Sequence, residues 1–250
     1  MAVLVTGGAR GLGAAVCRQI AARDHVVAVA DLDQANPEAV AKACGKAAFA
    51  VPVDLSTANG PAAMVDAVVA RAGRLDVLVN CAAVAPAEAF LDMTAAAWEQ
   101  ALLVNVRAIA LAMAAAGRVM ARGSGRIINV TSAAARMALP NYAAYAASKS
   151  AVDSLTRTAA VALAARGIRV NSISPGMMDT PLQQETEAIF CRLDGRSDLE
   201  AYKAERTARI PLGRRSDPEE MAQMVVWLAL DAPDYMTAER LNVSGGLDKD

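Results

Sequence analysis

The sequence predicts a doubly wound α/β domain, in which about seven short parallel strands form one sheet with helices on both faces. Short β-branched runs alternate along the chain with longer, alanine-rich segments of helical period. The strand candidates are apolar throughout, which is typical of parallel strands buried on both faces. No linker rich in Pro, Gly or Ser and no internal repeat divides the 250 residues, so we expect a single domain over residues 1–250.

The expected elements follow one another as strand, helix, strand along most of the chain. The strands are expected at Val3–Thr6, Val26–Ala30, Ala48–Val53, Leu75–Asn80, Arg126–Thr131, Ile168–Ile173 and Leu241–Val243. The helices are expected at Leu12–Ala22, Pro37–Cys44, Pro61–Arg71, Thr94–Met120, Tyr142–Ala165 and Ser216–Leu230. Thr94 is a candidate N-cap, and Pro218 lies near the first turn of the last helix. Because crossovers between parallel strands are right-handed, these units wind into one open sheet.

One segment breaks the alternation. Residues 181–211, from Pro181 to Pro211, contain no strand candidate and mix apolar side chains with charges. A structureless stretch of this length is uncommon inside a compact domain unless it has a function. We therefore predict that it forms a lid over the substrate.

Composition excludes several classes of function. The 25 basic residues are balanced by 26 acidic ones, so there is no basic excess for nucleic acid, and we expect no such partner. The single histidine, His25, rules out a His-rich metal centre and leaves almost no room for a Ser-His-Asp or Cys-His catalytic centre. We expect no bound metal. No apolar run approaches ~18 residues, so we expect no membrane span.

The cysteines and the N-terminus favour the cytoplasm. Cys17, Cys44, Cys81 and Cys191 are scattered, with neither a C-x-x-C pair nor metal-ligand spacing, as expected of reduced thiols. The first residues, Met-Ala-Val-Leu-Val-Thr-Gly-Gly, lack the basic region of a signal peptide.

A glycine-rich turn directly follows the first strand, Thr6-Gly7-Gly8-Ala9-Arg10-Gly11-Leu12-Gly13. Glycines permit a tight turn and let backbone N–H groups approach a pyrophosphate, while the positive end of the next helix faces the same anion. The strand before the turn and the helix after it favour a dinucleotide site. We expect the cofactor to contact Gly7, Arg10, Gly11, Leu12 and Gly13.

Asp31 ends the second strand, 18 residues beyond Gly13. A carboxylate there accepts hydrogen bonds from an adenosine ribose and repels a 2′-phosphate, since a like charge within ~4 Å costs about 4 kcal/mol at an effective dielectric of 20. Leu32 offers such a phosphate no cation. Arg10 argues the other way, because a basic group in the loop could bind a 2′-phosphate. Asp31 could instead cap the next helix, but we expect NAD rather than NADP.

Tyr145 and Lys149 stand at i and i+4, on one face of a predicted helix. Lowering the pKa of a tyrosine from about 10 to about 7 needs roughly 4 kcal/mol, and one cation ~5 Å away supplies about 3.3 kcal/mol at a dielectric of 20. The pair can therefore make Tyr145 a general base for an alcohol. An isolated pattern of this kind is usually plain surface helix. Tyr142 has Ala146 at its own i+4 position and is the weaker candidate.

Two further polar residues lie near this pair in the predicted fold. Ser132 follows a strand whose carboxyl end should line the ligand crevice, where its hydroxyl can bond the reacting oxygen. Asn105 interrupts an apolar helical run. It is either a satisfied core amide or a water holder that connects Lys149 to solvent.

Together these motifs, from Val3 to Gly246, resemble the short-chain dehydrogenase/reductase family. The resemblance implies a Rossmann-type sheet and a catalytic set of four residues, Asn105, Ser132, Tyr145 and Lys149. It implies that Asp54 and Leu55 contact the adenine, that Asn80 and the backbone at Ala82 border the adenosine ribose, and that Lys149 also binds the nicotinamide ribose. The nicotinamide carboxamide would be held by Pro175, Gly176, Met178 and Thr180. A homotetramer joined through the helices at 94–120 and 142–165 is also implied, although packing on the sheet explains their alanine-rich faces equally well.

Three motifs differ from the family pattern. Asn-Asn-Ala-Gly is Asn80-Cys81-Ala82-Ala83 here, Asp-Gly-Gly is Ser244-Gly245-Gly246, and Thr-Gly-Gln is Thr237-Ala238-Glu239. The alanine at 238, the lid and Pro211-Leu212-Gly213-Arg214 are similar to the branch that contains polyol and 2,3-butanediol dehydrogenases.

The leading hypothesis is NAD-dependent interconversion of a secondary alcohol and its ketone, with a polyol, sugar alcohol or small diol as the favoured substrate. An NADPH-dependent 3-oxoacyl-[acyl-carrier-protein] reductase is the enzymatic alternative, against which Asp31 and the lack of an obvious basic docking patch argue. A non-catalytic dinucleotide-binding protein is the third, but it predicts decay of the four catalytic residues, which are intact. Substrate specificity should reside in Ala133–Asn141 and the lid.

Overall fold

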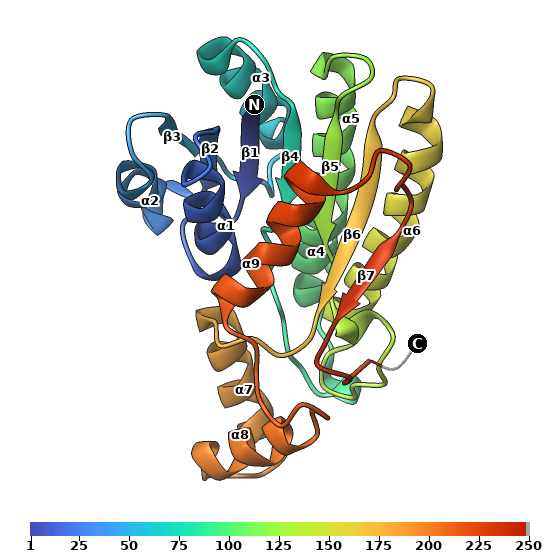
Figure 1. Cartoon of the computed structure of the whole chain (residues 1–250). Coiled ribbons are helices and arrows are strands. Elements are labelled where there is room, and N and C mark those ends of the chain that lie inside the picture. Colours follow the sequence, from blue (N-terminus) through green and yellow to red (C-terminus); the bar gives the residue numbers. More distant parts are fainter. Residues whose placement is uncertain (249–250) are drawn as a thin grey trace.

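The computed structural model describes residues 1–248 and contains one sheet of seven parallel strands, in the order β3-β2-β1-β4-β5-β6-β7 (Figure 1). The strands are β1 Ala2–Thr6, β2 Val26–Asp31, β3 Ala48–Pro52, β4 Val77–Asn80, β5 Arg126–Val130, β6 Arg169–Pro175 and β7 Arg240–Val243. The predicted doubly wound fold is confirmed; residues 249–250 of the predicted domain lie outside the described residues. Strand order reverses between β1 and β4, and ligands bind at the carboxyl ends of strands beside such a point.

Helices cover both faces of the sheet because its strands are apolar on both sides. On one face lie α1 Gly11–Ala21, α2 Pro37–Cys44 and α9 Pro218–Val226; on the other lie α3 Gly60–Ala72, α5 Ala108–Val119 and α6 Ala143–Ala164. Alternate residues of β1 serve the two cores: Val3 and Val5 face the first group of helices, and Leu4 faces the second. All five residues of β1 are buried, and a fully buried side chain of this kind contributes about 1.5–3 kcal/mol.

The helix predicted at 94–120 is interrupted by one π-helical turn. Its parts are α4 Ala95–Leu102, a π-helical turn at Leu103–Arg107, and α5. Thr94 is the predicted N-cap, since its Oγ1 accepts a hydrogen bond from the Ala97 N–H at 3.2 Å. Ala95–Val119 as a whole has the length and mean hydropathy, 1.6, of a membrane-crossing helix. One face of α5 packs into the core against the sheet, however, which accounts for that hydropathy.

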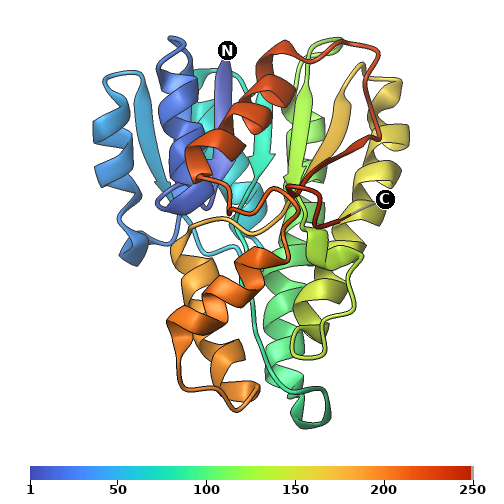
Figure 2. The same cartoon turned by 60° about the horizontal axis from the view of Figure 1, so that its bottom comes forward.

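The segment predicted as a lid folds into two helices, α7 Pro181–Leu193 and α8 Leu199–Ala208. Figures 1 and 2 show both helices standing beyond the carboxyl ends of the strands. Thr180 caps α7 by accepting a hydrogen bond from the Gln183 N–H at 3.3 Å. Phe190 and Tyr202 form a small core of their own between the two helices. The segment predicted as a lid therefore contains a packed helical unit that lies beyond the carboxyl ends of the strands.

Candidate active site

A cleft runs across the carboxyl ends of the strands. It brings together most of the residues predicted from the sequence: Gly7, Arg10, Gly11, Leu12, Gly13, Ser132, Tyr145, Lys149, Pro175, Gly176, Met178 and Thr180. These residues come from the turn after β1, the end of β5, the first half of α6 and the passage from β6 into α7. A dinucleotide loop and a tyrosine–lysine pair thus line opposite parts of one cavity.

The glycine loop has the geometry that a pyrophosphate requires. Gly7 and Gly11 have positive φ values of 66° and 53°, a conformation that side chains disfavour. A Cβ on Gly13 would lie 2.1 Å from the carbonyl oxygen of Gly7, so only glycine fits there. No side chain caps the start of α1, which leaves its first N–H groups open to a bound anion. The loop fits a dinucleotide.

Thr6 holds the loop after β4 against the glycine turn. Its Oγ1 accepts hydrogen bonds from the N–H groups of Cys81 at 3.0 Å and Ala82 at 3.1 Å. Neither Cys81 nor Ala83 has a positive φ, so the alanine that replaces the family's glycine at 83 is accommodated without strain. Cys81 and Ala83 line the cleft, which the sequence did not predict, while Ala82 lies just outside it, against Gly7. Burial raises the pKa of the Cys81 thiol to about 12.

The Asp31 carboxylate is fixed on the glycine loop although it does not line the cleft. Its Oδ2 accepts a hydrogen bond from the Ala9 N–H at 3.0 Å, and its Oδ1 accepts one from the Leu32 N–H at 2.8 Å. The alternative in which Asp31 caps the next helix is wrong, because Asn36 caps α2. Arg10 is directed toward the lid, where its Nη1 lies 3.4 Å from Glu185 Oε1.

Three residues predicted to bind the adenosine moiety lie outside the cleft lining. Asp54 is exposed and accepts two hydrogen bonds from Ser56, which lower the pKa of its carboxyl. Leu55 packs against the α3–α6 side of the core. The Asn80 side chain is buried and donates a hydrogen bond to Asn129 Oδ1 at 2.8 Å. Alternate residues of β4 point to opposite faces of the sheet, and the Asn80 side chain points to the face on which it bonds Asn129 of β5. Only the backbone of Asn80 therefore remains available to a cofactor.

Ser132, Tyr145 and Lys149 line one corner of the cleft. The Ser132 hydroxyl lies near enough to the Tyr145 phenol to act on its pKa, and the Lys149 Nζ lies 5.6 Å from the centre of the Tyr145 ring. The Lys149 ammonium also donates to the Val130 carbonyl oxygen at 2.9 Å. The side chains of Tyr145 and Lys149 are almost completely buried.

From the sequence we expect Lys149 to lower the pKa of Tyr145. This expectation is wrong when only the side chains of this protein are considered. Burial raises the pKa of Tyr145 to about 12, although the hydrogen bond from Ser132 acts in the opposite direction. Burial likewise lowers the pKa of Lys149 to about 8. For each of the two groups, the free energy of removing its charge from water is the largest cause of the pKa shift.

Asn105 has the contacts of a satisfied core amide. Its Oδ1 accepts from the Val84 N–H at 2.9 Å, and its Nδ2 donates to the Val84 carbonyl at 2.8 Å and to Ser148 Oγ at 3.0 Å. The π-helical turn places this amide between the segment after β4 and the helix that carries Lys149. Asn105 therefore fixes the spacing of two walls of the site without lining the cleft.

Tyr142, the weaker candidate in the sequence, lines the cleft beside Tyr145. The two rings stack with centroids 4.3 Å apart, and Phe190 of α7 meets Tyr142 edge-on at 5.0 Å. Their i, i+3 spacing already indicated a shared helix face. Tyr142 also lines a second chamber of about 610 Å³, which adjoins the cleft. The residues that line this chamber are Ser132, Ala133, Ala134, Met137, Leu139, Tyr142, Pro175, Gly176, Met177, Gln183, Thr186, Phe190, Arg206, Arg209 and Leu247.

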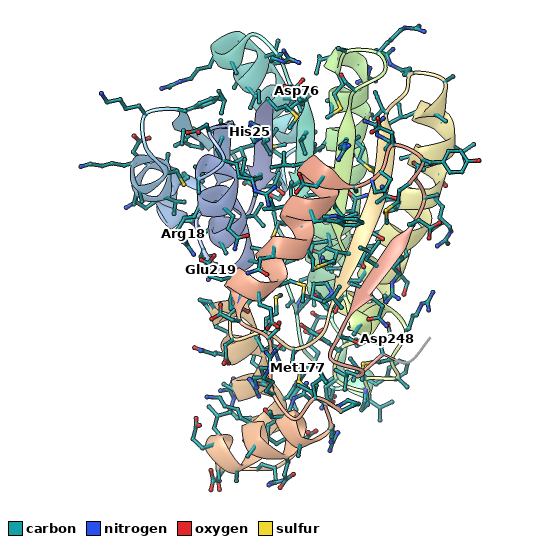
Figure 3. All side chains as sticks on the ribbon, viewed as in Figure 1. Arg18, His25, Asp76, Met177, Glu219 and Asp248 are labelled. Atoms are coloured by element: carbon teal, nitrogen blue, oxygen red, sulfur yellow. The ribbon has the colours of Figure 1, made fainter. Side chains whose placement is uncertain are left out.

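The single histidine takes no part in the cleft. Figure 3 shows His25 and Asp76 at the end of the molecule opposite to α7 and α8. Within residues 1–248 there is no group of three or more His, Cys, Asp or Glu side chains that could hold a metal ion.

Comparison with known proteins agrees with this geometry. A family profile described as "Enoyl-(Acyl carrier protein) reductase" matches residues 7–248. The cis-4-hydroxycyclohexanecarboxylate dehydrogenase of Sinomonas cyclohexanicum is 38% identical over 97% of this chain and 94% of its own length. Galactitol 2-dehydrogenase of Agrobacterium fabrum is 36% identical (97% and 95%), and L-2,3-butanediol dehydrogenase of Corynebacterium glutamicum is 34% identical (98% and 97%).

A solved structure shows the same fold. The blue fluorescent protein from a metagenomic library, in complex with NADPH, superposes with a TM-score of 0.86 at 33% identity, over 98% of this chain and 97% of that one. A parallel sheet with a glycine loop and a Ser-Tyr-Lys corner defines a nicotinamide-dependent oxidoreductase. The chain belongs to the short-chain dehydrogenase/reductase family and acts on CH–OH groups.

Proposed function

We propose that this chain oxidises a secondary alcohol to a ketone with NAD, using Ser132, Tyr145 and Lys149 as the residues that handle the proton. The observation that carries the proposal is the placement of these three side chains in the same cleft as a glycine loop that only glycines can form. The oxidised nicotinamide supplies the hydride acceptor and a second positive charge. The alcohol carbon would give up a hydride to that acceptor, and the hydroxyl proton would pass to the Tyr145 oxygen, which can accept it only as the phenolate. The positive charges of Lys149 and of the bound nicotinamide would favour the phenolate over the neutral phenol that burial favours.

Each residue of the corner has a distinct task. Ser132 holds the reacting oxygen beside Tyr145, because its hydroxyl lines the same cleft and lies near the phenol. The Nζ of Lys149 lies 5.6 Å from the Tyr145 ring. When Lys149 is protonated, its positive charge stabilises the Tyr145 phenolate. Asn105 acts at a distance, by fixing Val84 and Ser148.

NAD is the proposed cofactor because of Asp31. Its carboxylate is fixed 3.0 Å from the Ala9 backbone nitrogen, at the end of β2, where family members bind the adenosine ribose. A 2′-phosphate there would meet a like charge, while Arg10 is drawn toward Glu185. The remaining predicted cofactor contacts, at Asp54, Leu55, Asn80, Ala82, Pro175, Gly176, Met178 and Thr180, belong to the same proposal.

We also propose which kinds of secondary alcohol serve as substrates. The names of the galactitol and butanediol relatives support a polyol or small diol, and the name of the third relative supports a cyclic hydroxy acid. The lid over residues 181–211 and the connected chamber would make the choice. The chamber walls are largely apolar, which suits a carbon skeleton with few hydroxyl groups.

A homotetramer in the cytoplasm completes the proposal. Apolar side chains stand exposed on the helices expected to join subunits: Leu102 and Leu111 on the α4–α5 helix are 43% and 39% exposed, and Val161 on α6 is 78% exposed. Light scattering coupled to size-exclusion chromatography measures the mass directly. A monomer at micromolar concentration would contradict this assembly.

The reaction is tested by NAD reduction with a panel of polyols, diols, hydroxy acids and hydroxysteroids, with NADP run alongside. Tyr145→Phe should abolish turnover and leave NADH affinity within about twofold, since the phenol oxygen handles only the proton. Retained turnover in Tyr145→Phe would refute the proposed mechanism. A preference of the unaltered enzyme for NADP would refute the role given to Asp31 and favour the 3-oxoacyl reductase alternative.

A further inference from the structure

The chamber beyond Tyr142 adjoins the main cleft at Ser132 and Tyr142. It shares Ser132, Tyr142 and Gln183 with the main cleft, so a molecule whose hydroxyl reaches Ser132 extends into it. Figure 3 places Met177, one of its wall residues, where the sheet gives way to the α7–α8 pair. What lines this chamber therefore determines which alcohol fits.

The chamber lining is apolar with positive charge. Its hydrophobic members include Met137, Leu139, Phe190 and Leu247. Arg206 and Arg209 belong to the lining, and within residues 1–248 no aspartate or glutamate does. Such a lining favours a molecule with an apolar skeleton and an anionic end.

Arg206 is already neutralised by the protein. Its Nε donates to Glu187 Oε1 at 3.0 Å, and its guanidinium lies 5.1 Å from the centre of the Phe190 ring. Glu187 has no solvent exposure, and Arg215 also binds it, at 2.7 Å. Arg215 also lies 3.8 Å from Asp179 Oδ1, so two carboxylates face the two guanidinium groups, and Arg206 shapes the wall.

Arg209 has no such partner. It is exposed at the C-terminal end of α8, and its guanidinium makes no hydrogen bond or ion pair anywhere within residues 1–248. The neighbouring carboxylate of Glu205 is taken by Arg196, which binds both of its oxygens at 3.1 and 2.8 Å. A guanidinium with all its donors open at the rim of an apolar chamber is suited to bind a carboxylate in bidentate fashion.

We infer that the alcohol substrate carries a carboxylate, which Arg209 binds while the hydroxyl lies against Ser132 and Tyr145. The inference rests on the proposed function and specifies its substrate: a hydroxy acid in which an apolar carbon chain or ring separates the hydroxyl from the carboxylate. A neutral polyol would place a hydroxyl on every carbon against the side chains of Met137, Leu139 and Phe190, where few partners exist.

Paired substrates test the charge directly. The holoenzyme with NAD is given 5-hydroxyhexanoate and 4-hydroxycyclohexanecarboxylate, each alongside its primary amide, which has nearly the same shape without the charge. The unaltered enzyme should show a kcat/KM at least tenfold higher for each acid than for its amide. Arg209→Gln should remove most of this ratio by raising KM for the acids. Arg209→Lys should restore part of the acid-to-amide ratio, because lysine keeps the positive charge but lacks the two parallel N–H donors of a guanidinium.

Arg192→Gln is the matched control, since Arg192 is an exposed arginine of α7 outside both cavities. It should leave the ratio unchanged. Equal kcat/KM values for acid and amide, or an Arg209→Gln enzyme with an unchanged ratio, would overturn the inference while leaving alcohol oxidation with NAD in place.

A binding measurement separates this inference from the reaction itself. Cyclohexanecarboxylate, which has no hydroxyl to oxidise, is titrated calorimetrically into the complex of the enzyme with NADH. Binding that Arg209→Gln weakens at least tenfold, and Arg192→Gln does not, supports the carboxylate site even if no alcohol in the panel is oxidised. Equal affinity of the unaltered and Arg209→Gln proteins, or no binding at all, contradicts it.

Discussion

Glu187 and Arg215 form an ion pair that solvent hardly reaches, with Arg215 Nη1 2.7 Å from Glu187 Oε2 and the Glu187 side chain 0% exposed. Arg206 of α8 binds the other Glu187 oxygen at 3.0 Å. One carboxylate on α7 therefore joins α8 and the segment before α9. We expect the position of α7 and α8 to depend on this contact.

Loss of that charge should loosen the lid and destabilise the protein. Glu187→Gln leaves the Arg206 guanidinium without its counter-charge and Arg215 with only Asp179, 3.8 Å away. Breaking a buried pair in this way costs about 3–5 kcal/mol. Urea unfolding measures the free energy. The control is Glu185→Gln on the same helix, whose 61% exposed carboxylate meets Arg10 at 3.4 Å and should contribute less than about 1 kcal/mol. Equal stability losses in the two variants would show that the buried pair has no special weight.

The buried ammonium of Lys149 should make stability depend on pH in a defined direction. Its pKa is about 8 in the folded protein, against 10.5 for an ordinary lysine. Between these values the unfolded chain holds a proton that the folded protein has released, so the free energy of unfolding rises with pH. From pH 8 to 9.5 this group should add about 1.5 kcal/mol.

Lys149→Met provides the reference, because it removes this titration and leaves the others. The free energies of unfolding of both proteins are measured in urea at several pH values in this window. The unaltered protein should gain stability relative to the variant as the pH rises. Parallel pH profiles would mean that burial does not lower the pKa of Lys149.

The cofactor loop should tolerate no side chain at Gly13. A Cβ there would lie 2.1 Å from the Gly7 carbonyl oxygen, which is backbone and cannot turn away. Gly13→Ala must therefore displace the loop, and we expect NADH affinity to fall at least tenfold in a fluorescence titration. Gly117→Ala, within α5 and remote from the cleft, meets only the end of the Leu163 side chain, at 2.9 Å, and should bind NADH normally. Normal NADH binding by Gly13→Ala would remove the loop from the cofactor site.

Sequence patterns predicted those parts of the molecule that depend on local chemistry. Apolar strands and the glycine turn identified the sheet and the dinucleotide loop, and the i, i+4 spacing identified Tyr145 and Lys149. Three features depended on tertiary contacts instead. The helices of the lid contain the buried Glu187, which looks like surface charge until Arg206 and Arg215 are placed around it. The Asn80 amide turned away from the cleft because of strand register, and the pKa of Tyr145 rose because packing excluded water.

Ala238 retains a backbone conformation that suits glycine. Its φ is 65°, in the left-handed region, at the position where the family has the glycine of Thr-Gly-Gln. A left-handed non-glycine residue costs about 1–2 kcal/mol. Glycine would relieve that strain but lose about 0.4–1 kcal/mol through the greater freedom of the unfolded chain. It would also lose the partial packing of one methyl group against the core.

Ala238→Gly should therefore stabilise the protein slightly, by about 0.5 kcal/mol, as the balance of these terms. The same substitution at Ala114, exposed in the middle of α5, should destabilise it by about 1 kcal/mol, because glycine is a poor helix residue. Chemical denaturation of the two variants thus compares one change of side chain in two backbone conformations. If Ala238→Gly lost as much stability as Ala114→Gly, the strain at Ala238 would be absent in solution and the turn before β7 would have a different conformation.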